Sequence, residues 1–202
     1  MSKEFLDAKE RALELLSKAK DSGEVDRKAL AVVEVLNANP HYFTTSSCSG
    51  RVVVMEIPCV GMKKEACFLG RWHNVVSVDD VKKVLVNAKR GFIWFIAQPP
   101  IFHVVADDLE YAESLVKIGI ASGFKNSALR SIGKKIVVEL SSTERFDVPL
   151  GKDGIVFCDE KYIALLCSIS NDLMRKSVDK LVSFEKAVSR ENIRSLKKQM
   201  FK

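Results

Sequence analysis

The sequence predicts an α+β fold with helices at both ends and a mixed or antiparallel sheet between them. Apolar residues recur at helical spacing near the N-terminus and again from residue 160 onward. Between these segments the apolar residues come in short runs bounded by glycine, proline and serine, which is typical of strands. A G-x-G-x-x-G turn is missing, and helices do not alternate strictly with strands, so we do not expect a Rossmann fold.

Local signals place the elements along the chain. Asp-Ser-Gly ends the first helical pattern, Asn39-Pro40 ends the second, and S-V-D-D from residue 77 is a capping-box start. In order, we expect helices over 5–19 and 25–36, two strands within 42–57 folded about Ser49-Gly50, a strand over 66–72, a helix from 77, strands over 91–97 and 101–106 separated by Pro99-Pro100, a helix after Asp107-Asp108, strands over 124–131, 135–140 and 146–151, and one or two long helices from 160.

A weak internal echo suggests two similar α+β halves. "SSCSGRVVVMEI" and "NSALRSIGKKIVVELSS" both run from a serine-rich strand through a glycine turn and a basic residue into an aliphatic strand with a glutamate. We therefore predict a single domain over 1–202, with halves of about 40–90 and 91–160 and a C-terminal basic helix over 160–202.

Composition excludes several classes of protein. The 202 residues are 47% hydrophobic and 29% charged, as in ordinary soluble proteins. The five cysteines show no C-x-x-C spacing, and the three histidines do not pair at metal-binding spacing, so we expect neither a disulfide framework nor a metal site. The N-terminus lacks the apolar stretch of a signal peptide and no segment has 18 uninterrupted apolar residues, so we expect a cytoplasmic protein without a membrane span.

The net charge of +6 is located at the C-terminus. From residue 175 to 202 there are nine basic and three acidic residues, which accounts for the whole excess. A polyanion would meet this segment first, and Arg190, Arg194, Lys197 and Lys198 are our candidates for contacts with RNA phosphates. A solvated basic helix face explains the same charges equally well.

The stretch "TTSSCSGRVVV" is a polar cluster at the head of an apolar strand. Ser46, Ser47 and Ser49 supply hydrogen-bonding groups around a turn that Gly50 permits, and Arg51 adds a planar charged group suited to a carboxylate or phosphate. The cluster would suit the amino-acid end of a small ligand or an RNA phosphate. Serines that satisfy their own backbone are the alternative.

Other polar and aromatic residues extend the candidate site. His103 interrupts an apolar strand, where a histidine is more often a satisfied core group than a base. Trp72 is a core residue or a stacking surface for a base or an adenine. Asn126 and Ser127 head a strand after the turn at Gly123, as the serines do in the first cluster.

These motifs together resemble the tRNA wybutosine-synthesising protein three family of archaea and eukaryotes. The resemblance rests on "YFTTSSCSGRV", "GRW", "QPPIFHV", "GIASGFKNSA" and the proline of "FDVPLG", and runs from about residue 4 to 190. Three positions depart from the family pattern. Gln98 replaces an acidic residue, His73 is displaced, and Ser141 stands where an arginine is common.

The resemblance implies a non-Rossmann methyltransferase that uses S-adenosylmethionine. Its substrate would be N-4 of a 4-demethylwyosine intermediate, just 3′ of the anticodon in tRNA(Phe). On this reading Ser46, Ser47, Ser49, Gly50, Arg51, Trp72, Asn126 and Ser127 bind the cofactor or an adjacent phosphate, and His103 is the general base or a positioning donor. A non-catalytic tRNA-binding module is the alternative, and a helical interaction protein working through 160–202 ranks last.

Overall fold

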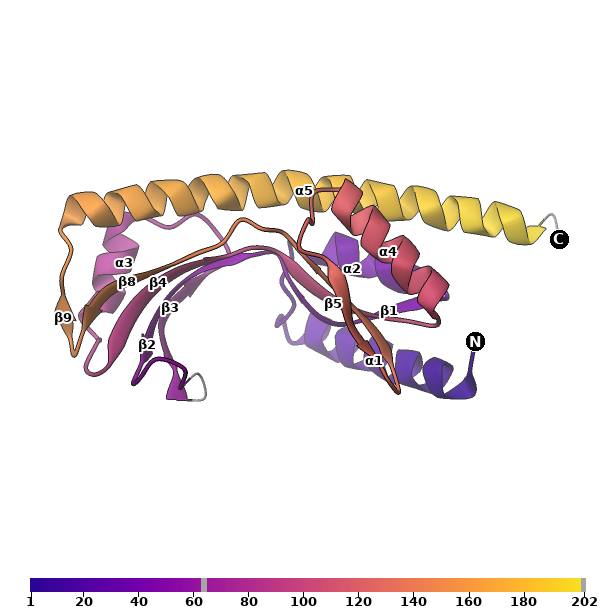
Figure 1. Ribbon diagram of the computed structural model, residues 1–202, viewed down its shortest axis with the longest axis horizontal. Coiled ribbons are helices and arrows are strands. Elements are labelled where there is room, and N and C mark those ends of the chain that lie inside the picture. The colour runs from indigo at the N-terminus through magenta and orange to yellow at the C-terminus, as the bar shows by residue number, and fades with distance from the viewer. Residues whose placement is uncertain (63–64, 201–202) are drawn as a thin grey trace. The chain divides into compact units, whose positions relative to one another are not determined.

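A computed structural model describes the backbone of residues 1–62 and 65–200 and the side chains of 1–62 and 65–194. The helices are α1 (Lys3–Asp21), α2 (Leu30–Ala38), α3 (Val78–Leu85), α4 (Leu109–Ala121) and α5 (Glu160–Met200) (Figure 1). The strands are β1 (Tyr42–Cys48), β2 (Arg51–Ile57), β3 (Cys67–Trp72), β4 (Phe92–Gln98), β5 (Ile101–Ala106), β6 (Ala128–Ile132), β7 (Ile136–Ser141), β8 (Phe146–Lys152) and β9 (Ile155–Val156). This is the predicted α+β class, with antiparallel sheets and helices at both ends.

The chain forms two compact units, each made of separate segments. The first unit comprises Met1–Ser49, Pro100–Thr143 and Val178–Lys202, and the second comprises Gly50–Pro99 and Glu144–Ser177. Each unit therefore takes chain from both of the halves that the internal echo suggested, and the pseudo-repeat stays a prediction. No helix in the described part of the chain combines the length and apolar character needed to cross a membrane.

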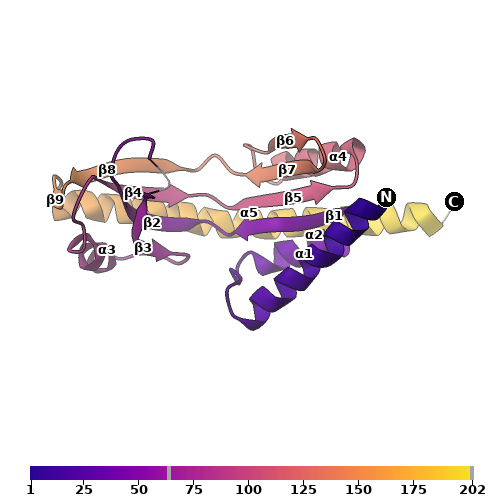
Figure 2. The same cartoon turned by 90° about the horizontal axis from the view of Figure 1, so that it is seen from below.

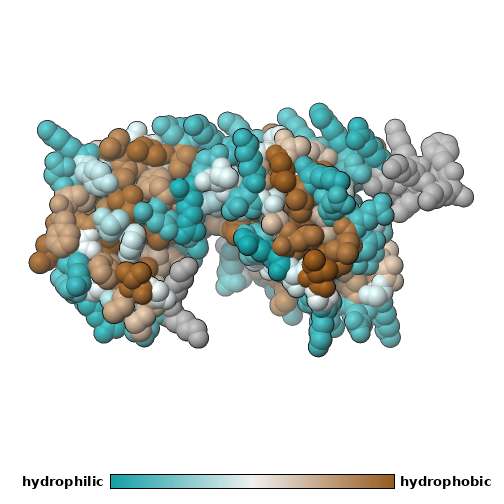
Figure 3. Space-filling view, in the orientation of Figure 1, coloured by the Kyte–Doolittle hydropathy of each residue, from teal (hydrophilic) through white to brown (hydrophobic). Residues whose placement is uncertain are grey.

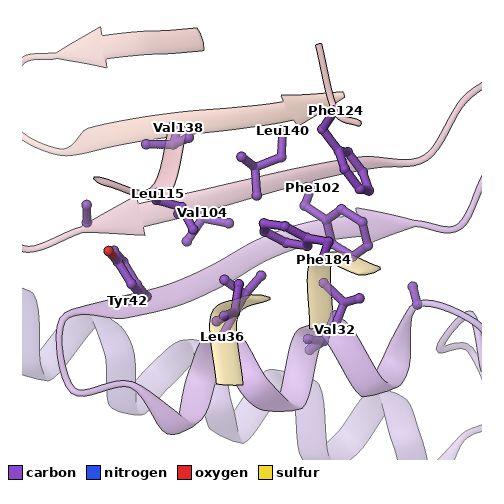
Figure 4. Packing of buried hydrophobic residues seen from close by; sticks show 14 of the residues in the cluster. Val32, Leu36, Tyr42, Phe102, Val104, Leu115, Phe124, Val138, Leu140 and Phe184 are labelled. Atoms are coloured by element: carbon purple, nitrogen blue, oxygen red, sulfur yellow. The ribbon is translucent and has the colours of Figure 1, made fainter. Parts of the chain in front are cut away.

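The first unit contains a sheet in the order β1-β5-β7-β6, with every neighbouring pair antiparallel (Figure 2). One face of this sheet packs against α2, α4 and the C-terminal part of α5, and Figure 4 shows the apolar side chains that meet there. The labelled residues are Val32, Leu36, Tyr42, Phe102, Val104, Leu115, Phe124, Val138, Leu140 and Phe184. The other face carries a smaller cluster in which Phe43 and Val105 pack against Phe5 of α1. We call this second surface the α1 face.

The second unit contains a sheet in the order β3-β2-β4-β8-β9. One face of the sheet packs against α3 and the N-terminal part of α5, through Val52, Val54, Ile93 and Phe95 among others. Side chains alternate along a strand, so Val53 of β2 and Trp94 of β4 lie on the opposite face of the sheet. We call that surface the outer face.

Capping side chains begin four of the helices, including α5, where Asp159 accepts a hydrogen bond from the backbone N–H of Tyr162. Ser2 accepts a hydrogen bond from the backbone N–H of Phe5, and Asp108 accepts one from Tyr111. Ser77 and Asp80 form the reciprocal capping box that the sequence predicts for α3. α1 ends at Asp21 and α2 ends at Ala38, close to the stop signals that the sequence predicts. However, α2 begins at Leu30 rather than at Val25.

The expectation of a hairpin within 42–57 is wrong. β1 pairs with β5 in the first unit, whereas β2 pairs with β3 and β4 in the second. Gly50, with a φ of 96°, lies where the chain passes from one unit to the other. The same kind of passage occurs between Pro99 and Pro100, where a strand break is expected because proline cannot donate to a ladder.

Candidate functional site

A row of polar side chains crosses three strands on the α1 face of the first unit. Ser46 of β1 lies opposite His103 of β5, and His103 lies opposite Glu139 of β7. His103 and Val105 are two residues apart, and Val105 packs toward α1, so the row lies on that face. The register of antiparallel pairing therefore brings together three residues that are far apart in the sequence.

Hydrogen bonds join the members of this row. Ser46 Oγ lies 2.7 Å from His103 Nδ1, and His103 Nε2 lies 2.8 Å from Glu139 Oε2. A carboxylate can only accept, so His103 Nε2 donates its proton to Glu139. In a neutral imidazole this leaves the Nδ1 lone pair as the acceptor for the Ser46 hydroxyl. Ser46 is exposed, so the hydrogen-bonded chain ends at solvent.

Arg130 completes the electrostatics of the row. Its guanidinium forms an ion pair with Glu139 Oε1, so each carboxylate oxygen has its own partner. The hydrogen bond from Arg130, with a further contribution from His103, lowers the pKa of Glu139 against the opposing effect of burial. Glu139 therefore stays ionised and can stabilise a positive charge that develops on His103.

The two serines Ser46 and Ser47 also line a hollow between α1 and β1. The hollow has a volume of about 530 Å³, and Arg11, Asp26 and Lys135 contribute polar groups to its wall. Glu24 and Val25, which follow α1, also line it, and the remaining residues are largely apolar and come from α1 and β1. The hollow gives a ligand of moderate size access to Ser46.

Ser49 lies just beyond the end of β1 and is buried. Its backbone N–H donates to Asp26 Oδ2 at 2.6 Å, but its hydroxyl has no hydrogen-bond partner among the described residues. The Ser142 hydroxyl is in the same state. Both residues are 2% exposed. They directly follow Cys48 of β1 and Ser141 of β7, and both of these residues lie opposite Ile101 of the central strand β5. A buried hydroxyl without a partner is rare, so these two suit a polar ligand.

Asn126 and Ser127 lie between α4 and β6, which is an edge strand of the first unit's sheet. The Asn126 backbone N–H donates to Ser141 O at 2.9 Å, and its side chain is exposed. The Ser127 hydroxyl donates to Phe124 O at 2.6 Å and lies close to Gly119. The geometry gives Ser127 a local structural contact, and the exposed Asn126 amide, which binds none of the described residues, can bind a ligand.

Gly50 and Arg51 belong to the second unit. Arg51 Nε donates to Gln98 Oε1 at 2.5 Å, and the Arg51 guanidinium lies 5.6 Å from the centre of the Phe68 ring. Gln98, where the resemblance leads us to expect an acidic residue, therefore holds the guanidinium without neutralising its charge. His73, the residue after Trp72, contacts the residue before Arg51: its Nδ1 donates to Gly50 O at 3.0 Å.

Trp72 and Arg51 lie on opposite faces of the second unit's sheet. Trp72 is paired with Val52 and packs against the core that α3 and α5 cover. Its indole also lies over Gly70, because a Cβ at Gly70 would be 2.2 Å from Trp72 Cη2. The structure thus does not bring these two predicted ligand-binding residues together, and the stacking role of Trp72 stays a prediction.

The predicted tRNA-binding residues lie on α5. Arg190 and Arg194 are exposed, and Arg194 lies 3.9 Å from Glu191. The same stretch of α5 packs on the sheet through Leu181, Phe184 and Val188, on the face opposite the Ser46–His103–Glu139 row. Figure 3 shows hydrophilic residues along this part of α5. Lys197 and Lys198 lie outside the residues whose side chains the structure describes.

Sequence reasoning missed Glu139, Arg130, Phe68 and Arg71. Glu139 is the one charged residue of β7, within the run "IVVEL", but its partner His103 is 36 residues away. Only the pairing register identifies it as the neighbour of His103. Arg71 lies inside the motif "GRW", where the flanking glycine and tryptophan carried the resemblance.

Curated relatives of this chain are named as methyltransferases. The family model described as Methyltransferase TYW3 matches residues 7–190. A Pyrococcus horikoshii protein is 42% identical over 93% of this chain and 96% of its own length. A Thermococcus sibiricus protein is 40% identical over 94% of each chain. Both are named tRNA(Phe) 7-((3-amino-3-carboxypropyl)-4-demethylwyosine(37)-N(4))-methyltransferase, the first with the suffix 1.

The fold is also that of a solved structure. A Pyrococcus horikoshii protein of 43% identity superposes with a TM-score of 0.86, covering 91% of this chain and 95% of its own. The family model covers far more than half of the residues and the relatives cover nearly all of them. The chain therefore belongs to the TYW3 methyltransferase family.

Proposed function

We propose that this chain methylates N-4 of 7-(3-amino-3-carboxypropyl)-4-demethylwyosine at position 37 of tRNA(Phe), with S-adenosylmethionine as the methyl donor. The names of relatives that match nearly the whole chain support this substrate. It carries one group more than the 4-demethylwyosine expected from the sequence, namely the aminocarboxypropyl side chain.

The Ser46–His103–Glu139 row is the observation that carries the mechanism. The donor supplies a sulfonium methyl group that is reactive by itself, so the protein has to position the acceptor and remove its proton. When the accepting ring nitrogen carries a proton, Ser46 Oγ accepts that proton as its own passes to His103 Nδ1. His103 becomes an imidazolium, and the Glu139 carboxylate, 2.8 Å from Nε2, stabilises the new positive charge.

The residues near this row fit a polar ligand. The hollow beside Ser46 and Ser47 admits one, and the buried Ser49 and Ser142 hydroxyls lack partners among the described residues. We propose that Ser46, Ser47 and Ser49 hold the donor or the base, with Asn126 at the edge of the site, while ligand binding by Gly50 stays a prediction. The basic face of α5 remains our candidate for contacts with the tRNA backbone.

Single substitutions of the row test this function. His103→Gln should lower kcat by about 100-fold or more, since a positioned general base contributes about 10²–10⁴. Glu139→Gln should lower kcat less and shift the pH profile of kcat, because the imidazolium loses its counter-charge. Glu113→Gln is the control. That residue is on α4, exposed and paired with Lys117, and α4 covers the other face of the sheet.

Methyl incorporation into tRNA(Phe) that carries the demethylwyosine base is the assay, and calorimetry with S-adenosylmethionine measures donor binding. His103→Gln with wild-type kcat and pH profile would remove the row from the mechanism. Failure of the wild-type protein to bind the donor, with or without tRNA, would instead favour the non-catalytic tRNA-binding module.

A further inference from the structure

A half-exposed aromatic ring with two guanidinium groups marks the outer face of the second unit. Phe68 is 49% exposed although it is a large hydrophobic residue. The Arg51 and Arg71 guanidinium carbons lie 5.6 and 5.7 Å from the centre of its ring. Both distances are within the range of cation–π attraction, so one ring orients two cations.

The strand register places these three side chains on one surface. Arg71 of β3 lies opposite Val53 of β2, and Arg51 is two residues before Val53, so Arg51 and Arg71 are diagonal neighbours on the same face. Phe68 lies opposite Met55, which is also on that face. The apolar residues packed against α3 and α5 are on the other face.

The charges of these two arginines are not neutralised by any side chain in the described part of the protein. Neither forms an ion pair with any residue that the structure describes, whereas Arg145 of the same unit binds both oxygens of Asp147. Arg51 uses Nε to bind the neutral Gln98, and this contact fixes its guanidinium while the terminal nitrogens remain available. A fixed, uncompensated pair of guanidinium groups is suited to an anion with several oxygens.

We propose that Arg51 and Arg71, oriented by Phe68, form a binding site for an oxyanion of the reactants. Arg71 and Phe68 thereby gain a role in substrate recognition. The oxyanion is a phosphodiester of the tRNA or the carboxylate of the methyl donor, since both offer the planar or forked oxygen pairs that a guanidinium binds in bidentate geometry. With a phosphodiester, the exposed Phe68 ring can also stack on a neighbouring base. This inference rests on the proposed function.

Arg71→Gln is the most direct test, because Arg71 is exposed and its loss should leave the fold intact. Affinity for tRNA(Phe) is measured by filter binding over a series of salt concentrations, and affinity for S-adenosylmethionine by calorimetry. A phosphodiester contact predicts weaker tRNA binding, by about tenfold at low salt, and a log–log salt slope reduced by about one. A donor carboxylate predicts unchanged tRNA binding and a donor affinity reduced by about tenfold.

Two further variants sharpen the test. Arg71→Lys keeps the charge but loses the forked geometry, so it should recover only part of the affinity. Lys82→Gln removes the same charge from α3, where Lys82 is paired with Glu160, and should leave both affinities unchanged. If Arg71→Gln behaves as Lys82→Gln in both measurements, the oxyanion site is refuted. The proposed function would still stand if the wild-type protein methylates its tRNA.

Discussion

Replacing Gly70 with alanine tests how the G-R-W motif is built. The new Cβ would lie 2.2, 2.7 and 2.9 Å from three carbons of the Trp72 ring, well inside the ordinary contact distance. The indole is rigid and packs against the second unit's core, so it has to rotate away or the strand has to move. Overpacking of this kind costs about 1–3 kcal/mol. In a chain of this size that loss lowers the melting temperature by about 2–12 °C.

Thermal unfolding followed by circular dichroism measures the effect, with Gly133→Ala as a matched control. At Gly133 the new Cβ would meet only Ser131 Oγ, at 3.8 Å, and stability should change by less than about 0.5 kcal/mol. In a Trp72→Ala background the ring is gone, and Gly70→Ala should then cost no more than the control. Equal stability of Gly70→Ala and Gly133→Ala in the wild-type background would refute the packing argument.

Three other expectations follow, two from the structure and one from the charges of the sequence. Phe184→Ala removes a fully buried ring and should lower the free energy of unfolding by about 3–5 kcal/mol in urea titrations, whereas the exposed Val182→Ala should change it little. Because the pKa of Glu139 is lowered in the folded protein, its ionised form contributes stability above the ordinary carboxyl pKa. This stability is lost as the pH falls through the lowered pKa. Between about pH 6 and about pH 3, Glu139→Gln should therefore lose less stability than the wild-type protein does. If about four charges of the α5 tail contact tRNA phosphates, the log–log salt slope should be on the order of −3 to −4, and changing all four to glutamine should flatten it without altering donor affinity. An unchanged slope would mean that the tail is only a solvated helix face. The four residues are Arg190, Arg194, Lys197 and Lys198.

The sequence predicted most elements of this fold because their signals are local. Capping residues, proline breaks and hydrophobic periodicity depend on neighbours within a few positions, and the expected α3 capping box and the β4–β5 break are confirmed. The partner of a strand depends on distant chain, so β1 and β2 looked like a hairpin although they belong to different sheets. Strand adjacency along the sequence is a weak guide when the connecting residues pass between compact units.

The candidate site was predictable in part for the same reason. His103 and Ser46 stood out as polar residues in apolar or strand-like contexts, and the structure places them 2.7 Å apart. Glu139 joins them only through the β5–β7 register, which no local pattern encodes. Trp72 and Arg51 are near in the sequence motifs but lie on opposite faces of one sheet, since side chains on paired strands alternate between faces.

The single helix α5 has a consequence for how the protein is made. Its first part supplies Ile163, Leu166, Cys167 and Met174 to the core of the second unit, and its later part supplies Leu181, Phe184 and Val188 to the core of the first. A ribosome synthesises this helix after all the other helices and strands described, so a nascent chain that stops before residue 160 holds neither core complete. Neither unit can complete its core before α5 is made, and a premature stop codon anywhere before residue 160 would inactivate both units together.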